Sequence, residues 1–503
     1  IFLIMFGAIF VIFVLCLLLW LYLFWKNVTQ YWTKLGVPHQ PPHPLLGSLT
    51  FLQHKNFNIW LMDTYRHFST PYVGIWLFWR PALIINSPTI ARNILIRDFA
   101  NFRNRFMKLG TFDAIKHNLF TVNDPLWSSF RRSLTTVFTA SKLKALQSLF
   151  DKKADQLVQR IKNTEDKSKI DIRLLFTDYT TDLIGTASFG VETTATLTGE
   201  DPIRTVTKSF MSFDWYKGIC WSTIFFFPTL AEMSIFPRST TDFFNKIFKT
   251  VIKQRKEHAK NPKESKDLVD TLLKLKDDGI ENNKEFSDED ITAQAVIFLL
   301  GGYETSGSVL TFLLYELAFR PEIQEKLYTE LSEAKKKNPN GSLDINIQAD
   351  LIYLNCVIKE TLRMYPPLGW LDRVALSDYK VDETLTIPAG TQVFVNVIGM
   401  HYDSELYPDP ETFNPDRFLP ENKKDMNQFS YKPFGDGPRN CIGKRFGEIS
   451  LRNGLSYLVS NFKFKPIPGT PKPSEVKFEL RQLLLVPGER LHIDFEQRIK
   501  PST

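Results

Sequence analysis

The hydrophobic pattern separates an uncharged N-terminal segment from a long body in which apolar and polar residues alternate. Residues 1–25 carry no charge, and at ~1.5 Å per residue a helix of this length crosses a hydrocarbon core of ~30 Å. Trp20, Tyr22 and Trp25 gather at its end and Lys26 follows, as at a membrane–water interface. A cleaved signal peptide would have a shorter apolar region preceded by basic residues. The pattern therefore predicts an uncleaved membrane anchor over residues 1–25.

The residues after this segment are basic and rich in proline. Four prolines lie between positions 38 and 44, and because proline fixes φ, such a stretch favours an extended, semi-rigid chain. We expect residues 26–50 to form a hinge. No long linker interrupts the remainder of the chain, so residues 51–503 are predicted to be one large catalytic domain.

The body has mostly helical periodicity with short strand-like runs. Long helical patterns dominate from about residue 124 to 364, whereas residues 73–78 and 81–86 predict a β-hairpin and residues 392–397 a further strand. The fold class predicted from this pattern is mainly α with small β-sheets.

One predicted helix is unusually long and apolar. Ser287 precedes the acidic turn Asp288-Glu289-Asp290, which is typical of a helix N-terminus. The apolar run continues to about Phe319, and Pro321 is placed to open the next helix.

The middle of this helix carries glycines and a polar pair. Gly301 and Gly302 each cost about 1 kcal/mol relative to alanine, so they indicate either close helix packing or a distorted helix beside a ligand. Glu304 and Thr305 follow at once. A carboxylate and a hydroxyl on an apolar helix need partners or water, and these residues alone do not decide between the two interpretations.

Charge and cysteine usage exclude some classes of protein. The net charge is +7, but no basic stripe or nucleic-acid motif is present, so we expect a membrane surface or an acidic protein as partner and no nucleic acid. Cys16, Cys220, Cys356 and Cys441 show neither disulfide-like nor metal-ligand spacing. This usage suits a reducing compartment.

The most informative stretch is the loop Phe434-Gly435-Asp436-Gly437-Pro438-Arg439-Asn440-Cys441-Ile442-Gly443. Its glycines and proline predict a tight turn, and residues 444–458 predict a helix whose N-terminus favours a thiolate at Cys441. A thiolate can bind iron, and Arg439 can pair with a carboxylate. A covalent nucleophile would need a histidine base. The histidine closest in sequence is His401, and it is not near Cys441. A structural cysteine remains open, whereas a dinucleotide loop lacks its third glycine.

This loop resembles the haem-binding signature of cytochromes P450. The resemblance covers essentially the whole chain, and the amino-acid sequence of the loop is most similar to that of insect microsomal P450s linked to xenobiotic metabolism. Four further elements agree in order and separation: Gly301-Gly302-Tyr303-Glu304-Thr305, Glu360-Thr361-Leu362-Arg363, Asn414-Pro415-Asp416-Arg417-Phe418 and Trp127-Ser128-Ser129-Phe130-Arg131.

The resemblance assigns roles to these residues. It implies that Cys441 is the iron ligand of haem b, and that Thr305, with Glu304, delivers protons during catalysis. It implies a buried network of Glu360, Arg363 and Arg417. The cofactor-binding set would include Trp127, Arg131, Arg373, Arg439, Phe434, Gly435 and Gly443. The substrate pocket would be lined by Phe106, Phe112, Phe120, Phe213, Phe298, Leu368 and Leu484.

The resemblance also implies NADPH- and O2-dependent monooxygenation of lipophilic small molecules, xenobiotics among them. The chain has no glycine fingerprint for flavin or NADPH, so electrons would come from an NADPH–cytochrome P450 reductase, with cytochrome b5 as a second donor. The expected location is the endoplasmic reticulum membrane, with the catalytic domain facing the cytosol. Residues 215–236 are apolar enough either to enter the bilayer or to form core. Reductase docking would use Lys444, Arg445, Arg132 and Lys142.

Three other functions stay open at this point. A biosynthetic P450 would act on a hormone or lipid. A haem-thiolate isomerase or dehydratase would need no electrons, but such relatives tend to lack the threonine found here at position 305. A non-catalytic haem carrier would need neither that helix nor a basic docking face.

Overall fold

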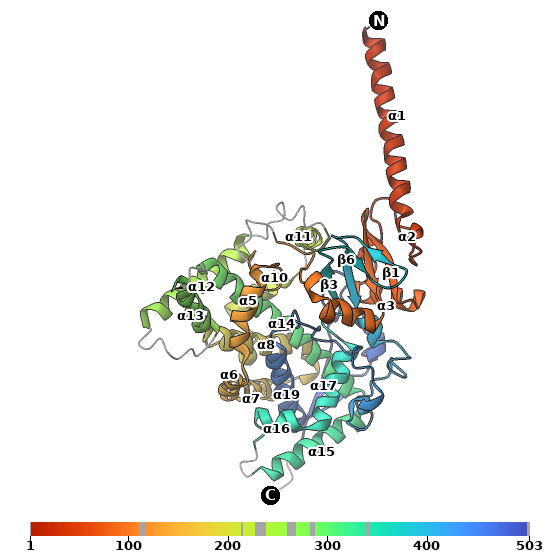
Figure 1. Cartoon of the computed structure of the whole chain (residues 1–503). Coiled ribbons are helices and arrows are strands. Elements are labelled where there is room, and N and C mark those ends of the chain that lie inside the picture. Colours follow the sequence, from red (N-terminus) through yellow and green to blue (C-terminus); the bar gives the residue numbers. More distant parts are fainter. Residues whose placement is uncertain are drawn as a thin grey trace.

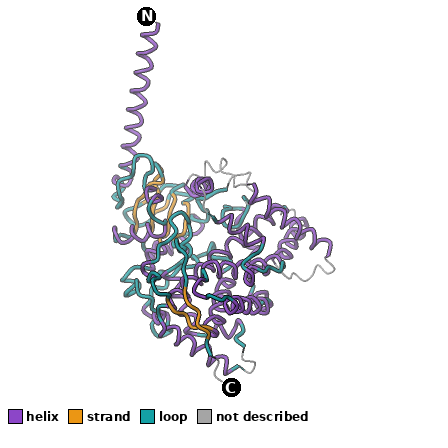
Figure 2. The backbone as a smooth tube through the Cα atoms, turned by 180° about the vertical axis from the view of Figure 1, so that it is seen from behind, coloured by secondary structure: helices purple, strands orange, loops and turns teal. Residues whose placement is uncertain are grey.

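A computed structural model shows a long N-terminal helix that stands out from a body of packed helices, with strands beside the base of that helix (Figure 1). The structure describes residues 2–109, 116–212, 215–226, 238–258, 268–281, 287–338 and 342–499. Seen from behind, a second pair of strands lies near the C-terminus (Figure 2). The predicted fold class, mainly α with small β-sheets, is confirmed.

The helices have the following bounds: α1 Phe2–Thr29, α2 Tyr31–Lys34, α3 Phe57–Phe68, α4 Pro88–Arg92, α5 Leu126–Thr135, α6 Ala140–Ala145, α7 Gln147–Asn163, α8 Ile172–Phe189, α9 Ala195–Thr198, α10 Pro202–Met211, α11 Trp215–Phe226, α12 Arg238–His258, α13 Leu268–Glu281, α14 Asp288–Ala318, α15 Pro321–Lys337, α16 Ile345–Asp350, α17 Ile352–Met364, α18 Val397–His401 and α19 Lys444–Asn461. The strands are β1 Tyr72–Leu77, β2 Arg80–Ile85, β3 Trp370–Val374, β4 Tyr379–Lys380, β5 Thr386–Ile387, β6 Gln392–Asn396, β7 Phe462–Pro466 and β8 Ile493–Gln497.

Helix α14 is the centre of the body and packs along α8. It begins as predicted, with Ser287 and Asp290 capping each other's backbone. A Cβ added at Gly302 would lie 2.8 Å from Ile184 of α8, and the Thr180 hydroxyl donates to the Tyr303 carbonyl at 2.6 Å. Gly302 therefore serves close helix packing.

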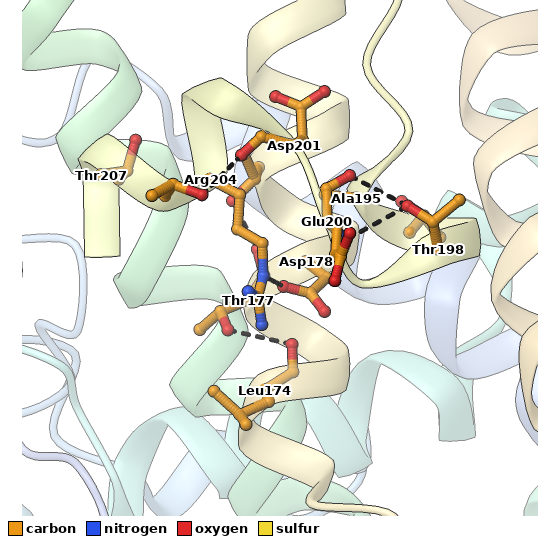
Figure 3. Close-up of polar contacts among 12 residues, drawn as sticks. Leu174, Thr177, Asp178, Ala195, Thr198, Glu200, Asp201, Arg204 and Thr207 are labelled. Atoms are coloured by element: carbon orange, nitrogen blue, oxygen red, sulfur yellow. Dashed lines mark hydrogen bonds and ion pairs between the residues drawn. The ribbon is translucent and has the colours of Figure 1, made fainter. Parts of the chain in front are cut away.

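Buried ion pairs join α8 to its neighbours. Asp178 accepts a hydrogen bond from Arg160 of α7 at 2.8 Å. It also pairs with Arg204 of α10 (Figure 3). Burial raises the pKa of Asp178, although the two guanidinium groups oppose that shift. One turn further on, Asp182 binds Lys153 at 2.9 Å with both side chains fully buried. Removing one partner of such a pair would leave an uncompensated buried charge, so these contacts fix the helices against one another.

The larger sheet has the strand order β1-β2-β6-β3. Strands β1 and β2 form the predicted hairpin, each starting one residue earlier than expected. β6 pairs in parallel with β2 and antiparallel with β3, so that Asp372 lies opposite Phe394. Strands β7 and β8 form an antiparallel pair of their own.

The end of α1 is joined to this sheet through two tryptophans. The buried Trp32 donates from its indole nitrogen to the Ile75 carbonyl, and Trp76 donates to the Val28 carbonyl, each at 3.0 Å. A Cβ at Gly74 would lie 2.4 Å from the Trp32 ring, so only glycine leaves room for it. The region predicted as a hinge therefore begins with a segment packed against the sheet, and the helix before it runs to Thr29 rather than to residue 25.

Two described helices are long and apolar enough to cross a membrane, Met5–Thr29 of α1 and Asp288–Ala318 of α14. Most of α14 is buried inside the body, as expected of a core helix, whereas the apolar part of α1 is exposed and its last turn contacts the sheet. The α1 segment therefore has the length and composition of a membrane anchor.

Candidate active site

The cysteine loop places Cys441 just before the first turn of α19. The Cys441 amide donates to the Phe434 carbonyl at 2.8 Å, and Gly437, at φ +67°, approaches the Leu95 carbonyl so closely that a Cβ would overlap it. The thiol is accessible but lies deep among protein atoms. Their desolvation raises the pKa of Cys441, while the Gly443 backbone N–H and the Arg131 charge lower it.

Helix α14 presents one open face toward this part of the molecule. Between Ile291 and Ala318 the positions that are not fully buried are Ile297, Gly301, Gly302, Thr305 and Ser306. Residues four apart share a helix face, so Ile297, Gly301 and Thr305 form a single stripe with Ser306 beside it, whereas Gly302 packs against Ile184 of α8. A Cβ at Gly301 would meet nothing within 4 Å, and one at Gly447 of α19 would lie 3.8 Å from the Ser306 hydroxyl. The stripe therefore faces the start of α19.

Thr305 and Glu304, the two predicted catalytic residues, have different surroundings. Thr305 lies on the open stripe and donates to the Gly301 carbonyl. Glu304 is buried and pairs at 2.9 Å with Arg173 of α8, which also donates to the Pro487 carbonyl. Adjacent helical residues point about 100° apart. The structure thus brings Thr305 to the open face and holds Glu304 on another side, through an arginine that the sequence did not identify.

Two of the predicted cofactor arginines, Arg373 and Arg439, are buried without an anionic partner. Arg373 donates to the Asp372 carbonyl at 2.6 Å, and Arg439 donates to the Val122 carbonyl at 2.9 Å. Within the described ranges neither guanidinium forms an ion pair. Burial, followed by the nearby Arg105, lowers the pKa of Arg439 to about 8 and that of Arg373 to about 9.

Arg105 is a third member of this cluster, and no sequence pattern indicated it. Its Nη1 pairs with Asp372 at 2.8 Å. The Nε atoms of both Arg105 and Arg373 are buried and have no hydrogen-bond partner in the structure. No local spacing points to Arg105, because a bridge between Asn104 and Val374 brings its segment to β3.

This donor set fits a haem group. Buried cations without partners favour an anionic ligand, and the two propionates of protoporphyrin supply two carboxylates. Among the described residues, no three His, Cys, Asp or Glu side chains stand together as a site for a bare metal ion.

The predicted pair Trp127 and Arg131 lies on α5, one turn apart. Trp127 contacts the Arg439 guanidinium with its ring, 4.3 Å from the centroid. Arg131 donates to the carbonyl and the side-chain oxygen of Asn440, at 2.9 and 2.7 Å. The two side chains therefore hold different parts of the cysteine loop and do not share one partner here.

Phe434, Gly435 and Gly443 shape the two ends of the loop. The Phe434 ring lies 5.7 Å from the Lys444 ammonium, and Gly435 adopts φ +73°, which favours glycine. Gly443 is the N-cap of α19. These residues set the backbone around Cys441, which agrees with their predicted place in the loop.

Glu360, Arg363 and Arg417 form one buried network. Arg363 donates to both carboxylate oxygens of Glu360, at 2.7 and 2.8 Å, and Arg417 donates to the same group at 3.1 Å. The remaining Arg363 donors reach the carbonyls of His401 and Pro410. The structure thus brings together the three residues that the resemblance grouped.

His401 extends this network toward the cysteine loop, a link that the sequence did not reveal. Its Nδ1 lies 2.9 Å from the Arg363 carbonyl, and its Nε2 accepts from the Lys432 amide at 3.2 Å. The Lys432 ammonium in turn binds Asp436 inside the loop at 2.6 Å. Burial lowers the pKa of His401 to about 3, so the imidazole stays neutral and its tautomer is fixed by these two contacts.

The predicted pocket residues are placed only in part. Phe106 and Phe298 are buried, with Phe298 at 5.3 Å from Phe138. Phe120 lies against the Arg105 guanidinium at 4.3 Å. Leu368 and Leu484 are half-buried, and Phe112 and Phe213 lie outside the described residues.

The apolar segment that begins at Trp215 divides between the two interpretations. In α11, Trp215 and Ile219 are exposed, with 74% and 52% of their surface accessible, whereas Ile224 and Phe226 are buried. One end of the helix therefore belongs to the core and the other faces outward. Residues 227–236 lie outside the described part of the chain.

Two of the predicted docking residues, Lys444 and Arg445, begin α19, whereas Arg132 lies in α5 and Lys142 in α6. Lys444, Arg445 and Arg132 are exposed, and Lys142 is half-buried with its ammonium on the Thr271 hydroxyl. A pocket of about 140 Å³ lies beside Lys444, between α17, the cysteine loop and α19. Most of the predicted basic residues are thus accessible from outside.

Comparisons with known proteins agree with this geometry. The family model described as Cytochrome P450 matches residues 37–493. The chain is 33% identical to cytochrome P450 6k1 of Blattella germanica over 480 residues, which covers 90% of this chain and 91% of that protein. It is 34% identical to cytochrome P450 6a2 of Drosophila melanogaster over 474 residues (90% and 92%). It is also 33% identical to cytochrome P450 3A9 of Rattus norvegicus over 484 residues (94% and 93%).

Proposed function

Because this chain belongs to the cytochrome P450 family and is a P450 monooxygenase, we propose that it oxidises lipophilic small molecules, xenobiotics among them, with haem b held by Cys441. The observation that carries the proposal is the accessible Cys441 thiol just before α19, the helix whose Gly447 lies beside Ser306 on the open stripe of α14. Bound haem would supply oxygen activation, which a thiolate ligand promotes by electron donation.

Several groups of this chain support the cofactor. The Gly443 amide and the Arg131 charge favour the thiolate form of Cys441. Arg373 and Arg439 would bind the propionates, because charge-assisted hydrogen bonds give a buried guanidinium the partner it lacks. Trp127 keeps the Arg439 guanidinium in place by stacking on it.

Thr305 would order water on the open face and pass protons from it. Its hydroxyl keeps the Gly301 carbonyl as an acceptor partner, so its oxygen remains free to accept from a water molecule. Glu304 would join this route only after its carboxylate leaves Arg173. Rotation of the Glu304 side chain is therefore a step that the proposed proton delivery requires.

Apolar character supports the proposed substrate class. Phe106, Phe120 and Phe298, with Leu368 and Leu484, would line the pocket, and aromatic linings favour lipophilic ligands. The resemblance of the cysteine loop to insect microsomal P450s linked to xenobiotic metabolism favours xenobiotics. A biosynthetic role on a hormone or lipid is the second candidate, since the same lining would suit it equally well.

The proposed location is the endoplasmic reticulum membrane, with α1 as its single anchor and the body in the cytosol. The apolar and unburied α1 supports this, as do the exposed Trp215 and Ile219 of α11, which would meet lipid. The basic surface at Lys444, Arg445 and Arg132 would receive an acidic partner. We assign that partner as NADPH–cytochrome P450 reductase, with cytochrome b5 as a second electron donor.

Two measurements test the proposed function. The ferrous protein under carbon monoxide should give the thiolate-ligated difference spectrum, and Cys441→Ala should abolish it while Cys356→Ala, which removes a buried thiol elsewhere, should not. Turnover of a panel of lipophilic compounds with reductase and NADPH then distinguishes a monooxygenase from an isomerase, which needs no electrons, and from a haem carrier. A Cys441→Ala protein that keeps the spectrum would overturn the assignment.

The role of Thr305 has its own test. Thr305→Ala should divert NADPH oxidation from product into peroxide, so that product formed per NADPH falls severalfold. Thr311→Ala is the matched control, because this buried hydroxyl makes the same bond one turn back, to the Gly307 carbonyl, but lies off the open stripe. Equal coupling in both variants would rule out the proposed proton role.

A further inference from the structure

Asp372 is a buried carboxylate that no motif of the sequence singled out. It lies in β3 with 1% of its surface exposed and uses both oxygens. Oδ1 accepts from the Arg105 guanidinium at 2.8 Å, and Oδ2 accepts from the Phe106 backbone amide at 3.1 Å. One side chain therefore holds two consecutive residues of a segment 266 positions away.

The segment is attached to β3 at its start but not by a regular ladder. Val374 donates to the Asn104 carbonyl at 3.0 Å in an isolated bridge. In a regular antiparallel ladder the Phe106 amide would donate to a backbone carbonyl of β3. Here it donates to the Asp372 carboxylate instead. Asp372 itself is fixed by the pairing of β3 with β6, so it offers a rigid point of attachment.

The same carboxylate determines the charge of the arginine cluster. The cluster contains three buried guanidinium groups, Arg105, Arg373 and Arg439, and one buried carboxylate, Asp372. Three positive charges less one negative charge leave +2. The nearby Asp124 pairs instead with the more exposed Arg103, at 3.4 Å.

We infer that Asp372 is a positioning residue that leaves this cluster with two uncompensated charges, one for each haem propionate, and fixes Arg105 and Phe106 beside them. The inference rests on the proposed function, because it assumes that haem b is the anion. Phe106 belongs to the proposed substrate pocket, so a single carboxylate connects the charge at the haem edge with the position of a pocket residue.

Charge variants of the haem-loaded protein test the first half of the inference. Asp372→Asn raises the cluster to +3 and should shift the iron midpoint potential upward, because positive charge favours the added electron. Arg105→Gln lowers the cluster to +1 and should shift the potential downward. The double variant restores +2 and should return the potential to near the wild-type value. Asp378→Asn is the control, since this exposed carboxylate also accepts a backbone amide, that of Ala389, at 2.9 Å.

Hydrogen exchange tests the second half and does not depend on the potential. Asp372→Ala removes the acceptor of the Phe106 amide, so exchange at that amide should become about tenfold faster, as expected for loss of one charge-assisted hydrogen bond. Asp372→Asn retains an oxygen acceptor and should change this exchange much less.

The outcomes separate the inference from the function beneath it. If the wild-type protein shows the thiolate spectrum but the potentials of the three charge variants coincide with that of Asp378→Asn, the charge role of Asp372 is overturned while the proposed function stands. Unchanged exchange at Phe106 in Asp372→Ala overturns the positioning role. A wild-type protein without haem overturns the proposed function and the charge role together.

Discussion

Two groups of buried arginines in this protein differ in how their charges are matched. Around Glu360, the guanidinium groups of Arg363 and Arg417 meet one carboxylate and a set of backbone carbonyls. In the second group the hydrogen bonds of Arg373 and Arg439 go to carbonyl oxygens alone, and the buried carboxylate of that group is already bound to Arg105.

The contrast separates a structural network from a binding site. A buried charge is stable when the protein itself supplies its partners. Where the protein supplies too few, the pKa of the arginine falls, as it does for Arg439 and Arg373. The first group therefore stabilises the fold without a ligand, whereas the second is complete only with an anion.

Breaking the group around Glu360, in which the protein itself supplies the partners of the buried charges, should have the largest effect on stability. Glu360→Ala leaves Arg363 as an uncompensated buried charge, and the free energy of unfolding should fall by about 3–5 kcal/mol. Urea unfolding measures it. Glu383→Ala is the control, because its pair with Lys380 is on the surface and should matter by less than about 1 kcal/mol. Similar losses in both variants would mean that the two kinds of ion pair do not differ.

Removing a cation from the second group, which contains Arg373 and Arg439, should not destabilise the protein without haem. Arg373→Met removes a buried charge, so the stability of the apoprotein should stay equal or rise. Haem affinity should fall by about 1.5–3 kcal/mol, the worth of hydrogen bonds to a charged group. Haem transfer to an acceptor protein measures this loss, with the exposed Arg97→Met as control. An apoprotein destabilised as much as Glu360→Ala would contradict the comparison.

His401, which contacts Arg363 of the group around Glu360, should also make the stability of the protein depend on pH. The folded pKa of His401 is about 3, well below its ordinary 6.5, so between these values the unfolded chain binds the extra proton. Stability should therefore fall as the pH drops below 6.5, by at most ~1.4 kcal/mol per unit. Urea midpoints at pH 6.5 and 5.5 should differ less in His401→Gln than in the wild type. The exposed His67→Gln should leave the wild-type difference unchanged; a flat wild-type profile would exclude this role.

Replacing exposed cations should have the smallest effect. These residues are a third case for the comparison, because their charges are solvated by water. Water solvates Lys444 and Arg445, so they need no partner inside the protein, and replacing either by alanine should leave stability nearly unchanged. Each should weaken reductase docking by less than about 1 kcal/mol and reduce the salt dependence of electron transfer. Stopped-flow reduction at several salt concentrations measures this, with Lys380→Ala as control. A salt dependence equal to wild type would place docking elsewhere.

Local sequence patterns predicted much of the fold. The cap at Ser287, the hairpin of β1 and β2 and the start of α19 depend on neighbouring residues, so spacing alone predicted them within a few positions. The resemblance seen in the cysteine loop is confirmed by the family match. It also grouped Glu360 with Arg363 and Arg417, which the structure brings together.

The contacts that the sequence did not reveal join distant segments. Arg173 meets Glu304 across 131 positions, and Arg105 meets Asp372 across 267. Neither arginine lies in a spacing that indicates its partner, because only the packing of α8 on α14, or of an irregular segment on β3, brings each pair together. For the same reason the sequence placed Glu304 with Thr305 and could not foresee that an ion pair holds it elsewhere.

The indole of Trp32, seated over Gly74, has a consequence for how the molecule stands at a bilayer. A free tether would let the body swivel and sample many attitudes beneath the lipid. Here the Trp32 and Trp76 donors hold the chain around the end of α1 against the edge strand β1. With α1 as the proposed anchor, tilt of that helix would be transmitted directly to the sheet, and the height of the catalytic centre above the lipid would follow from it.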